Sequence, residues 1–423
     1  TRRDFLKTST KAVAAGSLAA TVALQTPMVH AADSDVIKVA LIGCGGRGTG
    51  AAVNAMHAHP NNRLTVMCDL FSDQLDSAKA RLGRSLGQQY AVTDDQCFTG
   101  FDGYLDVMKT DVDVVILTTP PHFRPMQLKA CIDAGKHVFC EKPVAVDAPG
   151  VRSVFETVEA AKKKNLTIVS GLCWRYDLGV RETMKRIQDG AIGDVVAVQE
   201  NYLTGTLWHR GRKDDWSEME YQCRNWLYFT WLSGDHINEQ HIHSLDKGLW
   251  LNDDQAPLAC YGLGGRQVRT SAEWGNIYDH HAVCYEFPNN VRVYAYTRQQ
   301  GGCFNEVDDI VLGSKGQARI LKNSIDGAMD WSYSGPRPSM YDVEHKELFD
   351  ALRAGQTINN GDYMAKSTMM AIMGRMATYT GQRVTWDMAI GSKEDLRPSK
   401  YEWGGVDVPG NTEIAMPGKT KFV

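Results

Sequence analysis

Residues 37–48 read IKVALIGCGGRG, a strand-like run followed by a cluster of glycines. A pyrophosphate that binds at a helix N-terminus needs free backbone N–H groups with no Cβ atoms in the way. In that arrangement Gly43 permits a tight turn, Gly45 lets the backbone approach the phosphates, and Gly48 lets helix and strand pack closely. The stretch therefore predicts a strand, a turn and a helix that bind a dinucleotide. The candidate phosphate-binding residues are Gly43, Gly45, Gly46, Arg47 and Gly48.

A glycine pattern of this kind is weak evidence for dinucleotide binding by itself. The evidence becomes stronger if an acidic residue follows about 20 residues later. There an apolar run at 64–67 is followed by Asp69. A carboxylate at the end of the second strand accepts hydrogen bonds from the adenosine ribose and repels a 2′-phosphate. Asp69 therefore favours NAD over NADP, although an Asp at this place also fits the cap of a following helix.

Strand and helix signals continue to alternate up to about residue 172. The apolar run 112–117 predicts a strand, and 137–140 predicts the next one along the chain. Ligands of a doubly wound parallel sheet bind beyond the carboxyl ends of its strands, so the turns that follow should face the nicotinamide. We expect an α/β Rossmann domain at 35–172. Its further cofactor contacts are predicted to be Thr119, Pro120, His122, Glu141 and Lys142.

The first 31 residues match the pattern of a twin-arginine export signal. Arg2 and Arg3 precede an apolar, alanine-rich stretch at 12–24, and small residues follow it. The apolar stretch is too short and too interrupted for a convincing membrane span. We expect a signal peptide at 1–31 and a periplasmic or exported protein without stable membrane insertion. An uncleaved membrane anchor is the alternative.

Composition indicates an ordinary enzyme with more than one core. The chain has 423 residues, 43% hydrophobic content and a formal net charge of −4, which gives no basic bias towards nucleic acid. Its ten cysteines lack C-x-x-C pairing, so they are better explained as small buried residues than as a zinc site or a disulfide framework.

The character of the sequence changes at about residue 173. Strand-like segments lie at 195–202, 281–287, 291–296 and 309–312, and helical segments at 180–189 and 239–249. This mixture predicts a C-terminal α+β domain at 173–397, with a large, mostly antiparallel open sheet and helices on one face. The residues 398–423 are rich in Pro and Gly and predict an extended tail.

An aromatic-rich stretch follows residue 202 and includes Trp208 and Trp226. Flat rings stack on the apolar faces of sugars, so these two residues are candidate substrate contacts. Aromatic side chains also fill interdomain cores, and that alternative stays open for each of them.

The glycine fingerprint, the Thr-Thr-Pro-Pro turn at 118–121 and the Glu-Lys-Pro triplet at 141–143 resemble the glucose-fructose oxidoreductase and inositol dehydrogenase family, Gfo/Idh/MocA. The resemblance covers the chain after the signal. The family's second motif, an acid-x-x-x-His sequence on a helix that faces the nicotinamide, is matched by Glu239 and His243. The chain departs from the family in its Glu in place of Asp, and in His241 where a small residue is common.

In this family a Lys and a His together oxidise a sugar hydroxyl. The resemblance implies that His243 accepts the hydroxyl proton, that Lys142 binds the hydroxyl and shares the proton, and that Glu239 orients His243. The side chain of Glu239 is one carbon longer than the family's Asp, which puts in doubt how it orients His243. Residues matched to positions near the cofactor or substrate are Arg175 for the cofactor, and Tyr176 and His241 for the substrate. The family also implies a homo-oligomer, a dimer or tetramer, built on the open face of the sheet.

Three histidines in one segment also suggest a metal site. His241 and His243 form an H-x-H pair, and His236 with Glu239 would add ligands. The family needs no metal and the segment already has a role, so we expect none.

The preferred function is an exported NAD-dependent oxidoreductase that oxidises a secondary hydroxyl, at carbon 3, of a sugar or glycoside. No free dinucleotide pool exists outside the cytoplasm, so the cofactor should be tightly bound and recycled in place. The first alternative is a glycosidase that works by transient oxidation, elimination and hydration. The second is a binding or sensing protein, against which the presence of both Lys142 and His243 argues.

Overall fold

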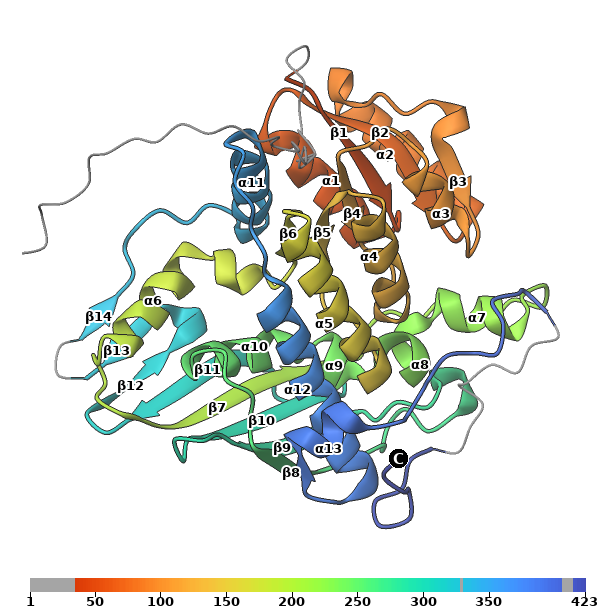
Figure 1. Cartoon of the computed structure of the whole chain (residues 1–423). Coiled ribbons are helices and arrows are strands. Elements are labelled where there is room, and N and C mark those ends of the chain that lie inside the picture. The colour runs from red at the N-terminus through yellow and green to blue at the C-terminus, as the bar shows by residue number, and fades with distance from the viewer. Residues whose placement is uncertain (1–34, 328–329, 405–413) are drawn as a thin grey trace, which may run out of the picture. The chain divides into compact units, whose positions relative to one another are not determined.

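The strand, turn and helix predicted at 37–48 are present. β1 (Ile37–Ile42) leads through the glycine turn into α1 (Gly46–Ala58). A computed structural model describes residues 35–327, 330–404 and 414–423, and Figure 1 shows their arrangement. The predicted export signal at 1–31 lies outside these residues and stays a prediction. Within the described ranges, no helix has the length and apolar character needed to cross a membrane.

The N-terminal domain is built on one parallel sheet of six strands in the order β3-β2-β1-β4-β5-β6. Its other strands are β2 (Asn62–Asp69), β3 (Cys97–Thr99), β4 (Val114–Leu117), β5 (His137–Cys140) and β6 (Ile168–Ser170). The strand order reverses between β1 and β4, and ligands of such sheets bind beyond the carboxyl ends of the strands at that point. The predicted Rossmann domain is confirmed.

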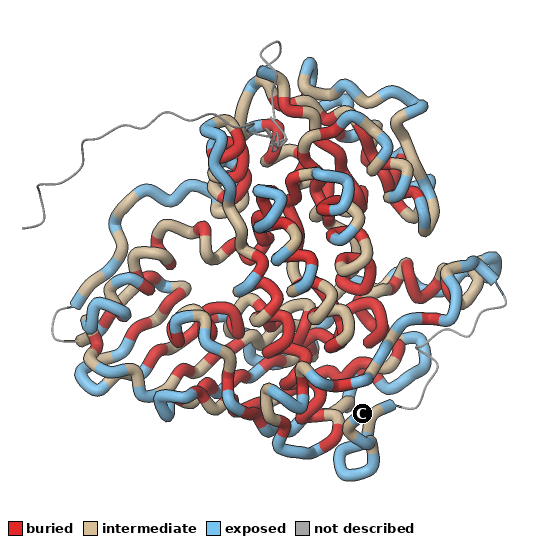
Figure 2. The backbone as a smooth tube through the Cα atoms, in the orientation of Figure 1, coloured by how far each residue is buried: buried red, intermediate tan, exposed pale blue. Residues whose placement is uncertain are grey.

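Helices cover both faces of this sheet, because parallel neighbours need crossover connections. They are α1, α2 (Ser72–Ser85), α3 (Gly103–Met108), α4 (Arg124–Asp133) and α5 (Ala148–Lys163). Successive residues of β4 enter different buried clusters, Val115 one and Ile116 the other, which explains why this strand is apolar throughout. Figure 2 shows buried residues concentrated in these strands and in the helices between the two sheets.

The C-terminal domain contains a sheet of nine strands in the order β14-β13-β12-β11-β7-β10-β9-β8-β15. The strands are β7 (Val195–Thr204), β8 (Ala259–Gly265), β9 (His280–Glu286), β10 (Arg292–Gln299), β11 (Glu306–Gly313), β12 (Gly316–Arg319), β13 (Ser324–Asp326), β14 (Trp331–Ser332) and β15 (Val384–Thr385). All neighbours are antiparallel except β7 and β10. The predicted large, mostly antiparallel sheet is therefore confirmed.

The helices that follow the first sheet in sequence are α6 (Leu178–Gln188), α7 (Glu218–Arg224), α8 (Thr230–Ser233), α9 (His236–Glu239), α10 (Ile242–Leu251), α11 (Met340–Arg353), α12 (Gly361–Thr380) and α13 (Trp386–Gly391). The single helix predicted at 239–249 is wrong at its start, because the chain turns at Gln240 and His241 between α9 and α10. The Gln240 Oε1 atom accepts a hydrogen bond from Gln299 Nε2 at 2.9 Å, a tertiary contact at the turn.

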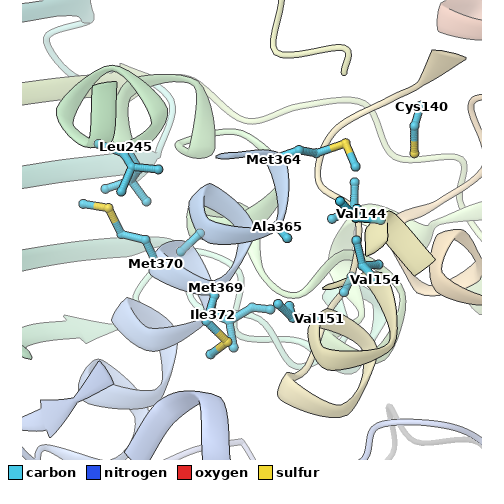
Figure 3. Packing of buried hydrophobic residues seen from close by; sticks show 14 of the residues in the cluster. Cys140, Val144, Val151, Val154, Leu245, Met364, Ala365, Met369, Met370 and Ile372 are labelled. Atoms are coloured by element: carbon cyan, nitrogen blue, oxygen red, sulfur yellow. The ribbon is translucent and has the colours of Figure 1, made fainter. Parts of the chain in front are cut away.

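Helix α12 joins the two domains through a methionine-rich surface. Figure 3 shows Met364 beside Val144 and Val154 of the first domain, and Met370 pointing towards Leu245 of α10. Unbranched Met side chains adapt to irregular gaps between packed elements. The two sheets are thus fixed to one shared core, which holds the edge of the Rossmann domain against α9 and α10.

Helix α11 returns to the first domain although it follows the second sheet in sequence. Asn54 Nδ2 of α1 donates to Asp342 Oδ1 of α11 at 2.6 Å, and Leu348 and Phe349 pack in the cluster on that face of the first sheet. The predicted range 173–397 therefore includes a helix that lies on the Rossmann domain.

Candidate active site

The glycine turn has the geometry that its sequence predicts. Gly43 has φ of +95°, a conformation that residues with a Cβ rarely adopt. A Cβ on Gly48 would lie 1.9 Å from the Gly43 carbonyl oxygen, so α1 packs directly on the turn. A Cβ on Gly45 or Gly46 would meet nothing within 4 Å. The backbone before α1 is therefore open to an approaching phosphate.

Asp69 ends β2 and connects the turn to the next helix. Its Oδ2 accepts a hydrogen bond from Cys44 N at 2.6 Å, and its Oδ1 accepts one from Phe71 N at 2.9 Å. Burial raises the pKa of Asp69, and these two N–H donors oppose that rise. The carboxylate is fixed in place at the pocket beside the turn, which fits the predicted contact with an adenosine ribose.

A pocket lies beyond the carboxyl ends of β1 and β4, at the predicted place. Among its lining residues are Gly43, Gly45, Asp69, Phe71, Phe101, Thr119, Pro120, Gln127, Arg210, Arg224 and Trp226. Thr119 and Pro120 were predicted contacts, whereas Phe71, Phe101 and Arg224 were missed. Arg224 comes from α7 of the second half of the chain, where nothing in the local sequence indicates a cofactor site. The open turn, the fixed carboxylate and this pocket fit an NAD molecule.

Arg47 and Glu141 connect the glycine turn to the end of β5. Arg47 Nε lies 2.5 Å from Glu141 Oε1, and Arg47 NH2 lies 3.3 Å from Glu344 Oε1 of α11. Burial opposes ionisation of Glu141, but Arg47 and Lys142 outweigh it and lower its pKa. Burial and the charge of Glu141 raise the pKa of Glu344 well above its usual range. The pair connects the glycine turn to the end of β5, and its contact with the cofactor stays a prediction.

Lys142 reaches across from the Rossmann domain to the second domain. Its Nζ donates to the backbone oxygen of Glu239 at 2.7 Å and lies 3.0 Å from Glu239 Oε1. Both side chains are mostly buried, with 14% and 16% of their surfaces exposed. Glu239 was predicted to orient His243, but the turn at 240–241 directs its carboxylate to Lys142. Its carboxylate and its backbone oxygen both contact the lysine ammonium.

His243 lies in the first turn of α10, near the same lysine. Its Nδ1 is buried and has no hydrogen-bond partner among the described residues. Burial and the nearby charges of Lys142 and Lys247 lower its pKa well below the usual range. The imidazole is therefore neutral at neutral pH, and its role as proton acceptor stays a prediction.

His122 follows the Pro-Pro turn and is a buried neutral ring. Its Nε2 lies 2.8 Å from the Tyr401 hydroxyl, and its ring meets Trp231 edge-on with centroids 4.8 Å apart. Burial lowers its pKa to about 3. The ring contacts Tyr401 and Trp231, and it is not among the residues that line the pocket.

Three of the residues matched by family position are held inside the fold. Arg175 Nε lies 2.9 Å from Asp246 Oδ2, and its guanidinium also pairs with Asp254 at 2.6 Å. Tyr176 is buried and donates to Asn360 Oδ1 at 2.7 Å. His241 is fully buried, 3.7 Å from Glu200 Oε2. Their described partners are side chains of the fold, and contact of these three residues with cofactor or substrate stays a prediction.

The two predicted aromatic contacts lie together at the rim. Trp208 and Trp226 meet edge-on with ring centroids 6.4 Å apart. Trp208 is 43% exposed, and Trp226 lines the pocket. Trp226 also packs against a buried cluster of the fold, and stacking of these two rings on a sugar stays a prediction.

The metal-site alternative of His236, His241 and His243, which was not expected to hold an ion, is not among the ligand groups that the described residues bring together. The described residues bring Asp235, His236 and His281 within ligand distance of one another. Asp235 Oδ1 lies 2.9 Å from His236 Nδ1 and 3.3 Å from His281 Nε2, while Oδ2 accepts from Tyr278 N and the Tyr379 hydroxyl. The hydrogen bonds that Asp235 accepts make it the centre of a buried polar network.

This network predicts a pH-dependent contribution to stability. Burial opposes ionisation of Asp235, but His281 and His236 outweigh it and hold its pKa well below the usual value. A depressed pKa stabilises the fold above the unfolded value of about 3.9, and that contribution is lost as the pH falls below it. We expect Asp235→Asn to lower the free energy of unfolding by about 3 kcal/mol at pH 7. Urea unfolding at pH 7 and at pH 3.5 should show the difference from wild type shrinking at the lower pH.

Asp133→Asn is the matched control, because that side chain is 56% exposed on α4. It should change stability little at either pH. A difference for Asp235→Asn that stays constant between the two pH values would contradict the assignment of an ionised Asp235.

Comparisons with known proteins agree with this geometry. Residues 37–172 match the model of the oxidoreductase family with an NAD-binding Rossmann fold, Gfo/Idh/MocA. Inositol 2-dehydrogenase of Salmonella typhimurium is 25% identical over 335 residues, which cover 75% of this chain and 87% of that protein. A glycosyl hydrolase family 109 protein of Shewanella amazonensis is 30% identical over 236 residues, 50% of this chain and 48% of that protein.

Solved structures share the fold over most of their length. Aldose-aldose oxidoreductase from Caulobacter crescentus, complexed with glycerol, has a TM-score of 0.65 at 18% identity and covers 83% of this chain and 99% of its own. The WlbA dehydrogenase from Bordetella pertussis, in complex with NADH and UDP-GlcNAcA, has a TM-score of 0.64 at 20% identity, with coverage of 83% and 97%. The family model matches the Rossmann domain at residues 37–172, and the solved structures share the fold beyond that domain.

Proposed function

We propose that this protein is an exported NAD-dependent oxidoreductase that converts a secondary hydroxyl of a sugar or glycoside, at carbon 3, into a ketone. The observation that carries the proposal is the meeting of Lys142, at the end of β5, with Glu239 and with the neutral His243 of the second domain. Binding of a dinucleotide alone does not require a lysine, a carboxylate and a neutral histidine close to one another, whereas a reaction of a substrate does. The sugar-related names of the relatives support the choice of substrate class.

The roles of the residues follow from their surroundings. The Lys142 ammonium has three N–H donors, and two of them donate to Glu239. The third donor is left for a substrate hydroxyl. His243 accepts the hydroxyl proton at its neutral ring. The hydroxyl carbon loses hydride to NAD, whose nicotinamide is the acceptor when bound. Loss of one proton and one hydride gives the ketone, and the reverse steps reduce a second carbonyl compound.

Export would separate the protein from free dinucleotide, so we propose that NAD stays bound and is recycled in place. The aldose-aldose oxidoreductase among the structural neighbours supports a reaction between two sugars. The relevant test is on the mature protein purified without added cofactor. Absorbance near 340 nm is followed while glucosides and disaccharides are added, and products are analysed by mass spectrometry. Reduction of bound cofactor with a product two mass units lighter supports the proposal. No response to any sugar would contradict it.

A second candidate is a glycosidase that uses the same oxidation transiently. The relative named as glycosyl hydrolase family 109, at 30% identity over half of this chain, favours keeping it. Oxidation beside the glycosidic bond would acidify a neighbouring C–H, and elimination, addition of water and reduction would follow. In the same experiment, cleaved glycoside without lasting reduction at 340 nm would select this candidate.

We also propose a homo-oligomer formed through the outer face of the second sheet. There β8 exposes Tyr261 and Leu263, and β10, on the other side of β9, exposes Tyr294 and Tyr296. Large exposed apolar patches of this kind usually mark interfaces. We expect light scattering to give a dimer or tetramer, and Tyr294→Glu to shift it towards monomer. Exposed Phe304→Ser, outside the strands, serves as the control, and a wild-type monomer would contradict the proposal.

A further inference from the structure

The C-terminal segment after α13 leaves the second domain and comes back to it. Glu394 Oε2 lies 2.5 Å from NH2 of the buried Arg375 on α12. Further along, the backbone oxygen of Ala415 accepts a hydrogen bond from the Tyr278 hydroxyl at 2.8 Å. Figure 1 shows the described part of the segment, in dark blue, running from α13 past α8 towards α7. The segment is therefore held by the second domain on both sides of its middle part.

The middle part lies on the Rossmann domain. Trp403 stacks on Phe71 with ring centroids 5.4 Å apart and meets Phe101 at 4.8 Å. Tyr401 meets Phe101 at 5.6 Å, and its hydroxyl lies 2.8 Å from His122 Nε2. Both aromatic side chains of residues 394–404 thus contact aromatic or imidazole rings of the first domain.

Of the rings they contact, Phe71 and Phe101 belong to the pocket and His122 does not. Phe71 and Phe101 line it together with Asp69, on the side expected for adenosine. A second connection crosses the same rim, since Arg224 of α7 makes two contacts of 3.1 Å with the carboxylate of Asp73. The Arg224 guanidinium also lies over the Phe71 ring, 4.0 Å from its centroid. Phe71 is therefore held between Trp403 and Arg224, two groups from distant parts of the chain.

We propose that residues 394–404 are a retaining strap of the cofactor site, and that NAD leaves only when Tyr401 and Trp403 detach from Phe71 and Phe101. The inference rests on the proposed function in one respect, that the pocket holds a dinucleotide. It adds a physical means for keeping that dinucleotide bound through many turnovers. Stacked rings lose their contacts together when the strap lifts, so release of the cofactor is coupled to lifting of the strap.

The test measures cofactor release without any sugar. Full-length protein is loaded with NADH and mixed with a large excess of NAD, and the fluorescence of bound NADH is followed over time. Removing one stacked aromatic pair is expected to speed release about tenfold, so Trp403→Ala should show that change. Tyr401→Phe removes only the hydroxyl bond to His122 and should give a smaller acceleration in the same direction.

Met416→Ala is the matched control, because Met416 is a half-exposed residue of the same C-terminal region outside the strap. It should release NADH at the wild-type rate. Unchanged release in both strap variants, with melting temperatures equal to wild type, would overturn the proposal while leaving the proposed function intact. A protein that binds no NADH at all would overturn the proposed function itself, so the two failures are distinguishable.

Discussion

Lys142→Met should lower kcat for sugar oxidation by a factor of about 10²–10⁴, the range that positioned acid–base groups contribute. The substitution keeps the length and apolar stem of the side chain but removes the ammonium that Glu239 holds at 2.7 and 3.0 Å. The substrate hydroxyl then loses both its donor and its partner in proton transfer. Cofactor binding should be retained, because the pocket around the glycine turn does not depend on Lys142.

The pH profile separates a catalytic lysine from a merely structural one. Burial is the largest cause of the low pKa of His243, and the charge of Lys142 is the next. In wild type the acidic limb of kcat/KM should therefore lie below the ordinary histidine value of about 6.5. Removal of the charge in Lys142→Met should move this limb of the residual activity to higher pH.

Lys129→Met provides the control, since that lysine is 60% exposed on α4 and pairs only with Asp133. It should keep both kcat and the pH profile. Full activity in Lys142→Met, or an unmoved acidic limb, would remove Lys142 from the proposed mechanism.

The parts of the fold that sequence predicts well are those whose pattern is local. β1, the glycine turn and α1 follow from residues that are adjacent in the chain, and so does the position of Asp69. The large second sheet was also predictable, because its strands alternate buried and exposed residues, as Val293 and Tyr294 do. Each of these features is encoded within a few residues of where it occurs.

The parts that sequence did not predict depend on contacts between distant segments. No glycine or proline marks the turn between α9 and α10, yet it redirects Glu239 from His243 to Lys142. The burial of His241 beside Glu200 was equally unpredictable from the local sequence, because it depends on the packing of α10 on β7. Trp403 stacks on Phe71 although the two residues lie more than 300 positions apart in sequence, and no periodicity could indicate this contact.

Gly48→Ala is expected to weaken NAD binding by about 10- to 100-fold, since overpacking of a tight contact costs about 1–3 kcal/mol. The new Cβ would lie 1.9 Å from the Gly43 carbonyl oxygen and 2.6 Å from Thr118 Oγ1. Neither atom has room to move, because Thr118 Oγ1 itself donates to that carbonyl at 2.6 Å. The clash would push α1 away from the turn and move the backbone N–H groups out of the positions in which they face the phosphates.

Gly50→Ala tests whether this effect is local to the turn. Gly50 lies half a turn further along α1, and a Cβ there would meet only the Arg47 guanidinium, at 3.6 Å. Alanine is the better helix former by about 1 kcal/mol, so Gly50→Ala should raise stability and leave NAD affinity unchanged. Titration calorimetry on protein stripped of cofactor measures both variants. Equal NAD affinities for Gly48→Ala and wild type would mean that the turn is not the phosphate site. If the N-terminus of α1 bound the phosphates, displacing α1 would weaken NAD binding.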